Sequence, residues 1–192
     1  MSLARLAPRL DTRGAVTQKT PPPPRSRRRG PANVLAIRPA SLADAPVIAR
    51  FRLALLQELA TNPVFARLRD DVGVRVERST TLHLASGREI TYLAFEGRNA
   101  IGMIRCLEAR GSPLLVPTRY GYVASAFVAR PHRRKGVLRK LMDAATTWAR
   151  ARGLTELRLH STPENAAASV VWERMGFATV EHLRRRELSR AP

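Results

Sequence analysis

Residues 128–139 read VARPHRRKGVLR and join an apolar, strand-like segment (120–128) to a strongly periodic helical segment (136–152). The first turn of a helix has backbone N–H groups without intrahelical partners and lies at the positive end of the helix dipole. Here the turn also contains Gly136 and a run of basic side chains, although it is neither a Walker P-loop nor a GxGxxG turn. Such a turn is typical of a site for phosphate oxygens and can hold a pyrophosphate without a metal ion. An ordinary helix start with solvated charges is the alternative interpretation of this segment.

A second segment, residues 165–177, reads NAAASVVWERMGF and follows one predicted strand later. Together the two segments resemble the GCN5-related N-acetyltransferase (GNAT) family, whose motifs are roughly V-x-x-x-[HY]-R-x-x-G-x-[GA] and N-x-x-A-x-x-x-Y-x-x-x-G-F. The matching residues are Val128, His132, Arg133 and Gly136 in the first motif and Asn165, Ala168, Gly176 and Phe177 in the second. The resemblance covers about residues 34–188.

Two positions depart from the family pattern. Leu138 stands where the family usually has Gly or Ala, and its side chain would narrow the phosphate turn. Trp172 stands where many members carry a tyrosine thought to protonate the leaving thiolate. Because an indole cannot deliver a proton at neutral pH, the family's common acid is missing here.

The resemblance implies an acetyl-CoA site where two strands, about 120–128 and 157–161, diverge at their C-terminal ends. Pantetheine would lie along the backbone of residues 126–128, and the pyrophosphate on the N–H groups of residues 134–138. Asn165 and Trp172 would flank the pantetheine and the thiol. The residues expected to bind acetyl-CoA are therefore Ala126, Phe127, Val128, Arg133, Arg134, Lys135, Gly136, Val137, Leu138, Arg139, Asn165 and Trp172.

The residue that removes a proton from the acceptor amine is not evident from the sequence. The predicted strand at 120–128 contains no carboxylate, whereas one branch of the family has a glutamate there. The candidates for the catalytic groups are Glu58 on the first predicted helix and the hydroxyls of Ser125 and Thr162 near the expected divergence of the strands. The alternation of residues leaves open which way His160 faces. No metal is expected, since the single cysteine, Cys106, excludes a multi-cysteine zinc site.

The composition indicates a globular domain preceded by a basic tail. The 192 residues include 34 Lys and Arg against 15 Asp and Glu, for a net charge of +19, which favours an anionic partner. Residues 1–33 contain four consecutive prolines and an arginine-rich run, which predicts a disordered tail before a domain at 34–190. A cleaved transit peptide and a nucleic-acid-binding arm are the alternatives for this tail. The chain has no apolar run of membrane-spanning length, and its one cysteine fits a cytoplasmic setting.

Hydrophobic periodicity and turn residues predict the element order βα(α)βββαβαββ. The strands fall at 33–39, 90–95, 100–107, 120–128 and 157–161, with two short strands over 177–188. The helices fall at 41–60, in part of 64–86, at 136–152 and at 165–175. The predicted fold is α/β (α+β): a mixed, mostly antiparallel central sheet flanked by helices, as in the acyl-CoA N-acyltransferase (GNAT) fold.

Three functions remain open at this point. The first is transfer of an acetyl group from acetyl-CoA to a primary amine of a small molecule. The second has a protein or peptide amine as acceptor. The third is a non-catalytic acyl-CoA-binding or nucleic-acid-associated module, with any nucleic-acid contact made by the basic tail. A homodimer is compatible with each of them.

Overall fold

A computed structural model describes residues 34–162 and 165–188 of the chain. The predicted basic tail, residues 1–33, lies outside the described residues, as do residues 189 and 190 at the end of the predicted domain. Disorder of the tail and its contact with nucleic acid therefore stay predictions.

A five-stranded sheet in the order β1-β2-β3-β4-β5 forms the centre of the fold. The first four strands pair antiparallel with their neighbours, and the fifth pairs parallel with the fourth. The prediction of a mixed, mostly antiparallel sheet is thus confirmed. The strands are β1 (Leu35–Pro39), β2 (Glu89–Glu96), β3 (Asn99–Arg110), β4 (Arg119–Val128) and β5 (Leu157–Leu159).

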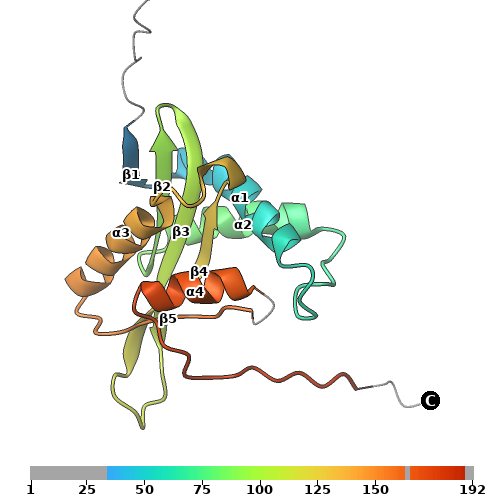
Figure 1. The fold of residues 1–192 in the computed structure, drawn as a ribbon, viewed down its shortest axis with the longest axis vertical. Helices are drawn as coiled ribbons and strands as arrows, with labels where there is room; N and C mark the ends of the chain where they lie inside the picture. Colours follow the sequence, from blue (N-terminus) through green and yellow to red (C-terminus); the bar gives the residue numbers. More distant parts are fainter. Residues whose placement is uncertain (1–33, 163–164, 189–192) are drawn as a thin grey trace, which may run out of the picture. The chain divides into compact units, whose positions relative to one another are not determined.

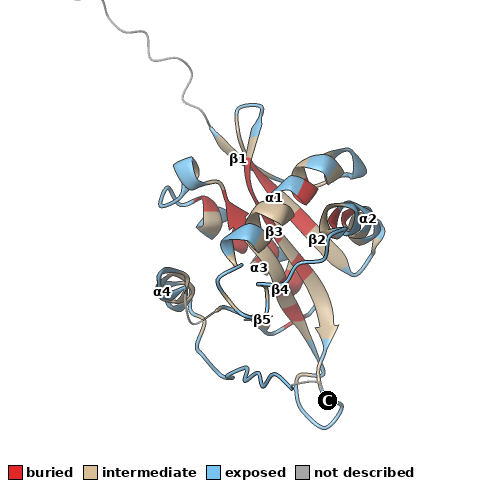
Figure 2. Ribbon diagram, turned by 90° about the vertical axis from the view of Figure 1, so that its right-hand side faces the viewer, coloured by how far each residue is buried: buried red, intermediate tan, exposed pale blue. Residues whose placement is uncertain are grey.

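Helices cover both faces of this sheet (Figure 1). In Figure 1, α3 (Val137–Ala151) and α4 (Ala166–Arg174) lie in front of the sheet, while α1 (Ala45–Glu58) and α2 (Val72–Ala85) lie behind it. Figure 2 confirms the two layers, since α2 and α4 lie on opposite sides of the strands. Alternating side chains of the strands therefore enter two separate apolar cores, one under α3 and one under α1.

The two cores fix which way each strand residue faces. The α3-side core contains Ile104, Cys106 and Val123 of the sheet together with Leu141 of α3. The α1-side core contains Leu93, Met103 and Phe127, which point to the opposite face of the sheet, together with Ile48 and Phe51 of α1. Cys106 is fully buried, and burial raises the pKa of its thiol to about 12, so it is a small core residue and no nucleophile.

Two glycines with positive φ follow the ends of β2 and α3, as the sequence predicts. Gly97 has a φ of 60° in the turn between β2 and β3, and Gly153 has a φ of 69° directly after α3. The N–H of Gly153 donates to the Arg150 carbonyl at 2.9 Å, as expected of a residue that closes a helix. The helical content predicted over 64–86 is confined to α2, because residues 59–71 form a series of turns around Pro63.

The prediction of two short strands over residues 177–188 is wrong. The structure assigns no strand there, and residues 178–188 are exposed throughout. β5 contains three residues, so it offers little edge on which another strand could pair. The segment instead runs along the outside of the domain, where Glu187 Oε1 lies 3.1 Å from Arg67 Nη1 in the turns between α1 and α2.

Within the described part of the chain, no helix combines the length and the apolar character that crossing a bilayer requires.

The short 3-10 turn (Leu42–Asp44) that leads into α1 is stabilised by a charged cluster around Asp44. The Asp44 carboxylate accepts hydrogen bonds from the Arg38 guanidinium at 2.8 Å and from the Ser41 N–H at 2.7 Å. Arg38 first, and Ser41 to a smaller degree, therefore hold the pKa of Asp44 well below its usual range. A carboxyl group with a lowered pKa stabilises the folded state above its unfolded pKa of about 4, and the contribution is lost as the pH falls below it.

We expect Asp44→Asn to lower the free energy of unfolding at pH 7 by about 1–2 kcal/mol, the usual contribution of a helix cap. In a domain of this size that corresponds to a drop of roughly 2–8 °C in Tm. The variant should also lose part of the wild-type decrease in Tm between pH 5 and pH 3. Thermal unfolding across this range measures both effects. Asp143→Asn is the matched control, because Asp143 is exposed on α3 and its carboxylate has no partner among the described residues; equal effects of the two variants would contradict the assignment.

Candidate active site

The turn between β4 and α3 has the backbone shape expected of an anion site. After β4 ends at Val128, a short 3-10 turn (Arg130–His132) leads into residues 133–136, which are exposed. Arg134 and Gly136 both adopt left-handed backbone conformations, with φ of 62° and 78°. The first intrahelical bond of α3 joins the Lys140 N–H to the Gly136 carbonyl, so the N–H groups before Lys140 have no intrahelical acceptor.

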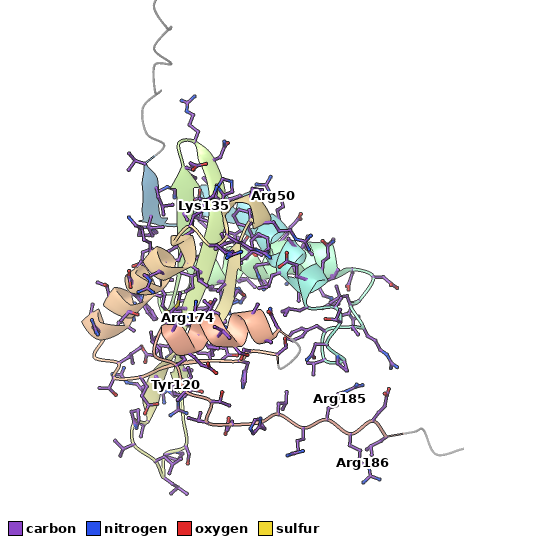
Figure 3. The ribbon with its side chains drawn as sticks, in the orientation of Figure 1. Arg50, Tyr120, Lys135, Arg174, Arg185 and Arg186 are labelled. Carbon is purple, nitrogen blue, oxygen red and sulfur yellow. The ribbon has the colours of Figure 1, made fainter. Side chains whose placement is uncertain are left out.

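Basic side chains surround this turn without being neutralised. Arg134, Lys135 and Arg139 are exposed and form no ion pair or hydrogen bond with any other described residue. Figure 3 shows Lys135 at the start of α3. Apart from the chain neighbours of Gly136, nothing lies within 4 Å of the position that its Cβ would take, so the turn is open to a ligand. The geometry therefore fits a pyrophosphate held by N–H groups and unpaired cations.

Arg133 faces away from this turn. Its Nε donates to the Val128 carbonyl at 2.8 Å, and its Nη2 donates to both carboxylate oxygens of Glu58 at 2.7 Å. Arg130 adds a longer bond to Glu58, 3.3 Å from Nε to Oε1. The three side chains tie the end of α1 to the end of β4. Glu58 is thus held by two arginines and is not a free carboxylate.

The two departures from the family motif lie on the core side of their helices. Leu138 is half-buried and packs against the α3-side core. Its side chain is therefore directed at the core, and the expected narrowing of the phosphate turn does not follow. Trp172 is half-buried on α4, with its ring edge-on to Phe177 at a centroid distance of 5.9 Å.

β4 separates from β5 halfway along its length. The parallel pairing ends at the Val123–Leu159 pair, while β4 continues for five more residues to Val128. On its other edge, β4 pairs with β3, and the register shifts there. Arg105 pairs with Ser125 and the next residue, Cys106, pairs with Val123, so Ala124 is an extra residue in β4. Such a bulge bends a strand and redirects its side chains. Ser125, Ala126, Phe127 and Val128 follow it on the part of β4 that is not paired with β5.

A cavity of about 150 Å³ lies between the end of α1 and the start of α4. Three of the predicted site residues come together there: Glu58, Thr162 and Asn165, with Leu59 and Thr61 completing the lining. Asn165 also caps α4, since its Oδ1 accepts the Ala168 N–H at 3.0 Å. Ser125 does not line this cavity; it lies on β4 opposite Arg105 of β3.

The sequence interpretation missed a hydrogen-bonded pair beside the point where the strands separate. Tyr122 Oη of β4 lies 2.6 Å from Nδ1 of His160, the first residue after β5. The rings meet edge-on, with centroids 5.6 Å apart. The parallel pairing of β4 with β5 was predictable in outline. The contact between Tyr122 and His160 depends on the register, which pairs Tyr122 with Arg158 and which the sequence does not determine. No group of three or more His, Cys, Asp or Glu side chains suited to a metal occurs in the described residues.

Comparisons with known proteins agree with this geometry. The family model for the acetyltransferase (GNAT) family matches residues 54–177. The chain is 29% identical over 99 residues to N-alpha-acetyltransferase 30 of Schizosaccharomyces pombe, which covers 50% of this chain and 63% of that protein. It is 33% identical over 63 residues to the chloroplastic GCN5-related N-acetyltransferase 6 of Arabidopsis thaliana, covering 33% and 22%. The chain thus spans less than two thirds of the length of either relative.

Solved structures share the fold at low sequence identity. A GCN5-related N-acetyltransferase from Ralstonia eutropha JMP134 superposes with a TM-score of 0.67 at 21% identity, covering 80% of this chain and 99% of that one. AAC(6')-Iy in complex with a CoA-containing bisubstrate analogue gives a TM-score of 0.65 at 18% identity, covering 81% and 99%. A ribosomal-protein-alanine N-acetyltransferase from Brucella melitensis biovar Abortus 2308 gives 0.60 at 19%, covering 81% and 99%. The central sheet and its flanking helices are therefore those of this group of folds.

Proposed function

The chain belongs to the acetyltransferase (GNAT) family, and from this membership we propose that it transfers an acetyl group from acetyl-CoA to a primary amine. The observation that carries the proposal is the turn between β4 and α3. It combines free helix N–H groups, a left-handed Gly136 and unneutralised cations at the end of a strand whose edge is open. This combination suits a long ligand with a pyrophosphate at one end.

Two parts of acetyl-CoA, the pyrophosphate and the pantetheine, have candidate binding residues in this proposal. The N–H groups from Arg134 to Leu138, with the side chains of Arg134, Lys135 and Arg139, would bind the pyrophosphate. The open edge of β4 from Ala126 to Val128 would pair with the amides of pantetheine, as an added strand would. Arg133 would stabilise the site indirectly, since it bonds both to the Val128 carbonyl of β4 and to Glu58. Trp172 of α4 packs against the α3-side core.

When bound, acetyl-CoA supplies the thioester whose carbonyl carbon the amine attacks. The chain contributes mainly position, by holding the thioester where the strands separate and admitting the amine from one side. It must also remove a proton from the amine, because an ammonium group has no lone pair for attack. Glu58 is already bound by two arginines and is a poor choice for this task. The hydroxyl of Ser125 lies on β4, and that of Thr162 lines the cavity. In this proposal they would orient water or the leaving thiolate.

We propose a small molecule as the acceptor. The cavity beside the site, about 150 Å³, has room for one end of a small amine. The negative charge of Glu58 in this cavity is exceeded by the positive charges of Arg130 and Arg133, which pair with it. The domain as a whole is also basic, since residues 34–192 contain 26 basic and 14 acidic residues. Such a surface repels polycations such as aminoglycosides, so a neutral or anionic amine is the better fit. A peptide amine is the second candidate, favoured by the match to N-alpha-acetyltransferase 30.

We expect acetyl-CoA to raise the Tm and to be consumed when a suitable amine is added. A ligand at 100 times its Kd stabilises the folded state by about 2.7 kcal/mol, or roughly 5–11 °C in a domain of this size. Thiol release measured with neutral amines, amino acids, polyamines and peptides tests the transfer and ranks the acceptors. A rise in Tm without thiol release for any amine would leave a non-catalytic acyl-CoA-binding module, and an unchanged Tm would contradict the site itself.

A further inference from the structure

Four ionisable side chains from four elements gather beneath α1 and α2. They are Arg52 of α1, His83 of α2, Glu89 of β2 and Arg105 of β3. Arg105 Nε lies 3.0 Å from Glu89 Oε2. Arg52 Nη1 donates to the Thr80 hydroxyl of α2 at 2.8 Å, and His83 lies one turn further along the same side of that helix. We call these four residues the arginine cluster.

The alternation of β3 places Arg105 on the face of the sheet that carries α1 and α2. Its two neighbours along the strand, Ile104 and Cys106, both belong to the α3-side core. Successive side chains of a strand point to opposite faces, so Arg105 points away from α3. Met103, two residues earlier on that face, packs in the α1-side core. The arginine cluster therefore continues the α1-side core toward α2.

The arginine cluster carries more positive than negative charge. Arg105 and Glu89 have only 12% and 16% of their side chains exposed. Burial, and then Arg105, lower the pKa of Arg52, but a guanidinium stays charged in proteins. Burial and Arg105 also lower the pKa of His83, while Glu89 acts in the opposite direction, so His83 is neutral at pH 7. Two cations thus share one carboxylate in a largely buried place, which is costly unless a further anion is supplied.

Hydrogen-bond donors are in excess in the arginine cluster. Among the described residues, the buried side-chain atoms without a hydrogen-bond partner are His83 Nδ1, Glu89 Oε2 and Arg105 Nε, all from this one place. A guanidinium has five N–H groups, and those of Arg105 form no aligned hydrogen bond with any described residue. Buried polar atoms of native proteins are ordinarily paired. A second carboxylate would supply the acceptors that these donors need.

The arginine cluster lies one strand away from the proposed position of the thioester. Arg105 pairs across the sheet with Ser125, on the part of β4 that is not paired with β5. Directly opposite residues project to the same face, with Cβ atoms about 4.5–5.5 Å apart. Burial raises the pKa of Tyr122, and Arg105 acts in the opposite direction, so its charge reaches the last rungs between β4 and β5. An acceptor whose amine meets the thioester there has its other end within reach of Arg105.

We propose that the arginine cluster binds a carboxylate of the acceptor, an inference that rests on the proposed acetyl transfer. The Arg105 guanidinium donates to the carboxylate, and His83 Nδ1 donates to it in the tautomer that carries its proton there. The charge of Arg52 balances the added negative charge. Glu89 holds Arg105 in place and competes with the acceptor for it. The substrate is thus an amine that carries a carboxylate at its far end.

Strand spacing sets the length of this acceptor. Neighbouring strands lie about 4.8 Å apart, so one to two spacings separate the amine from the guanidinium, roughly 5–10 Å. An extended chain spans about 3.5 Å for every three bonds. About four to eight bonds should therefore lie between the amine nitrogen and the carboxylate carbon. Amino acids with a terminal amine and dipeptides have this length, whereas the α-amine of a free amino acid, two bonds from its carboxylate, is too close.

The test compares acids with their primary amides as acceptors: glycine, 4-aminobutanoate, 6-aminohexanoate and 8-aminooctanoate. Hydrogen bonds to a charged group change affinity by about 10–150-fold. For the three longer chains, kcat/KM of the acid should thus exceed that of its amide at least about tenfold in wild type, while glycine is a poor acceptor. Arg105→Gln should bring this acid-to-amide ratio close to one, mainly through KM.

Glu89→Gln separates recognition from a structural role of the ion pair. It removes the carboxylate that competes for Arg105, so the acid-to-amide ratio should rise by about fivefold or more. An ion pair that only stabilises the sheet would lower the Tm in this variant and leave the ratio as it is. Where Arg105→Gln lowers the Tm below the assay temperature, the double variant Glu89→Gln/Arg105→Gln removes both charges together, and its ratio should also be close to one.

Arg119→Gln is the matched control. Arg119 of β4 also pairs with a glutamate of the neighbouring strand, 3.0 Å from Nη1 to Oε1 of Glu108. Arg152, directly after α3, lies 3.8 Å from the other oxygen of Glu108, which places this second pair on the α3 side of the sheet. The substitution should leave the acid-to-amide ratio unchanged.

Pentanoate, which has no amine, tests the site without turnover. With CoA present, it should shift the ¹⁵N resonances of the His83 ring saturably in wild type and in Arg119→Gln, and not in Arg105→Gln. Acetylation without preference for the acids, or a preference that survives Arg105→Gln, would overturn the carboxylate site and leave acetyl transfer standing. Absence of the pentanoate shift in wild type would overturn it too. Pentanoate binding in a protein that acetylates none of the amines would instead overturn the proposed function and leave an anion site.

Discussion

Gly136→Asp should weaken CoA binding by at least about a hundredfold while the domain stays folded. Apart from its neighbours along the chain, nothing lies within 4 Å of the added Cβ, so the side chain meets no steric clash with other parts of the protein. Its carboxylate would instead stand at the open turn, where the pyrophosphate is proposed to bind. A unit charge about 5 Å from a phosphate oxygen, at an effective dielectric constant of about 20, costs roughly 3 kcal/mol. That energy corresponds to about a hundredfold in Kd.

Gly153→Asp controls for the cost of the backbone conformation. Gly153 lies at the opposite end of α3, with a φ of 69° against 78° at Gly136, and its Cβ position is equally open. Both variants should therefore lose a similar amount of stability, of the order of 1–3 kcal/mol for a left-handed residue that is not glycine. Calorimetric titration with CoA separates them, because Gly153→Asp should bind as wild type does. Gly136→Asn, which lacks the charge, should fall between the two; equal CoA affinity in Gly136→Asp and Gly153→Asp would refute the phosphate turn.

The sequence was most informative about features that depend on residues close together in the chain. The strand before Val128 and the helix after Gly136 could be predicted because an alternating apolar pattern changes to a period of 3.6 residues at a glycine. The turn between β2 and β3 and the end of α3 were marked by Gly97 and Gly153 in the same way. These features depend on backbone conformation and burial within one or two neighbouring elements.

The sequence was least informative where side chains from distant elements meet. Arg133 looked like a phosphate ligand, yet it bonds to Glu58, 75 residues earlier in the chain. The choice between a phosphate and a carboxylate as its partner depends on where the end of α1 lies. The Tyr122–His160 pair depends in the same way on the register of β4 against β5 and could not be derived from alternation alone.

The incorrect strands over residues 177–188 have a related cause. A local pattern can predict that a segment is extended, but a strand also needs a neighbouring edge that satisfies its N–H and C=O groups. With β5 limited to Leu157–Leu159, the edge available beside it is short. The segment accordingly stays exposed, with Val180, Leu183 and Leu188 each more than three-quarters exposed.

Gly102→Ala should destabilise the fold and weaken CoA binding together. Gly102 of β3 pairs with Val128, and a Cβ at this position would lie 2.8 Å from the Phe127 carbonyl oxygen and 3.4 Å from the Val128 Cα. The closest of these atoms belongs to the backbone, and a side-chain carbon of Val128 lies 3.3 Å away, so the end of β4 must move to admit the methyl group. Overpacking of this kind typically costs about 1–3 kcal/mol, or roughly 2–12 °C in Tm.

The same displacement reaches the proposed pantetheine strand. Residues 126–128 would pair with pantetheine through their backbone, and the Ala129 N–H, which donates to the Ile101 carbonyl at 2.8 Å, continues the contact between the two strands. CoA affinity should therefore fall by about tenfold or more even at temperatures where the variant is fully folded. Gly87→Ala is the control, since nothing lies within 4 Å of its Cβ position and it lies between α2 and β2. Thermal unfolding and CoA titration of both variants would show whether a displacement of the end of β4 weakens CoA binding. If Gly102→Ala were destabilised and yet bound CoA as tightly as Gly87→Ala, pantetheine would have to bind elsewhere.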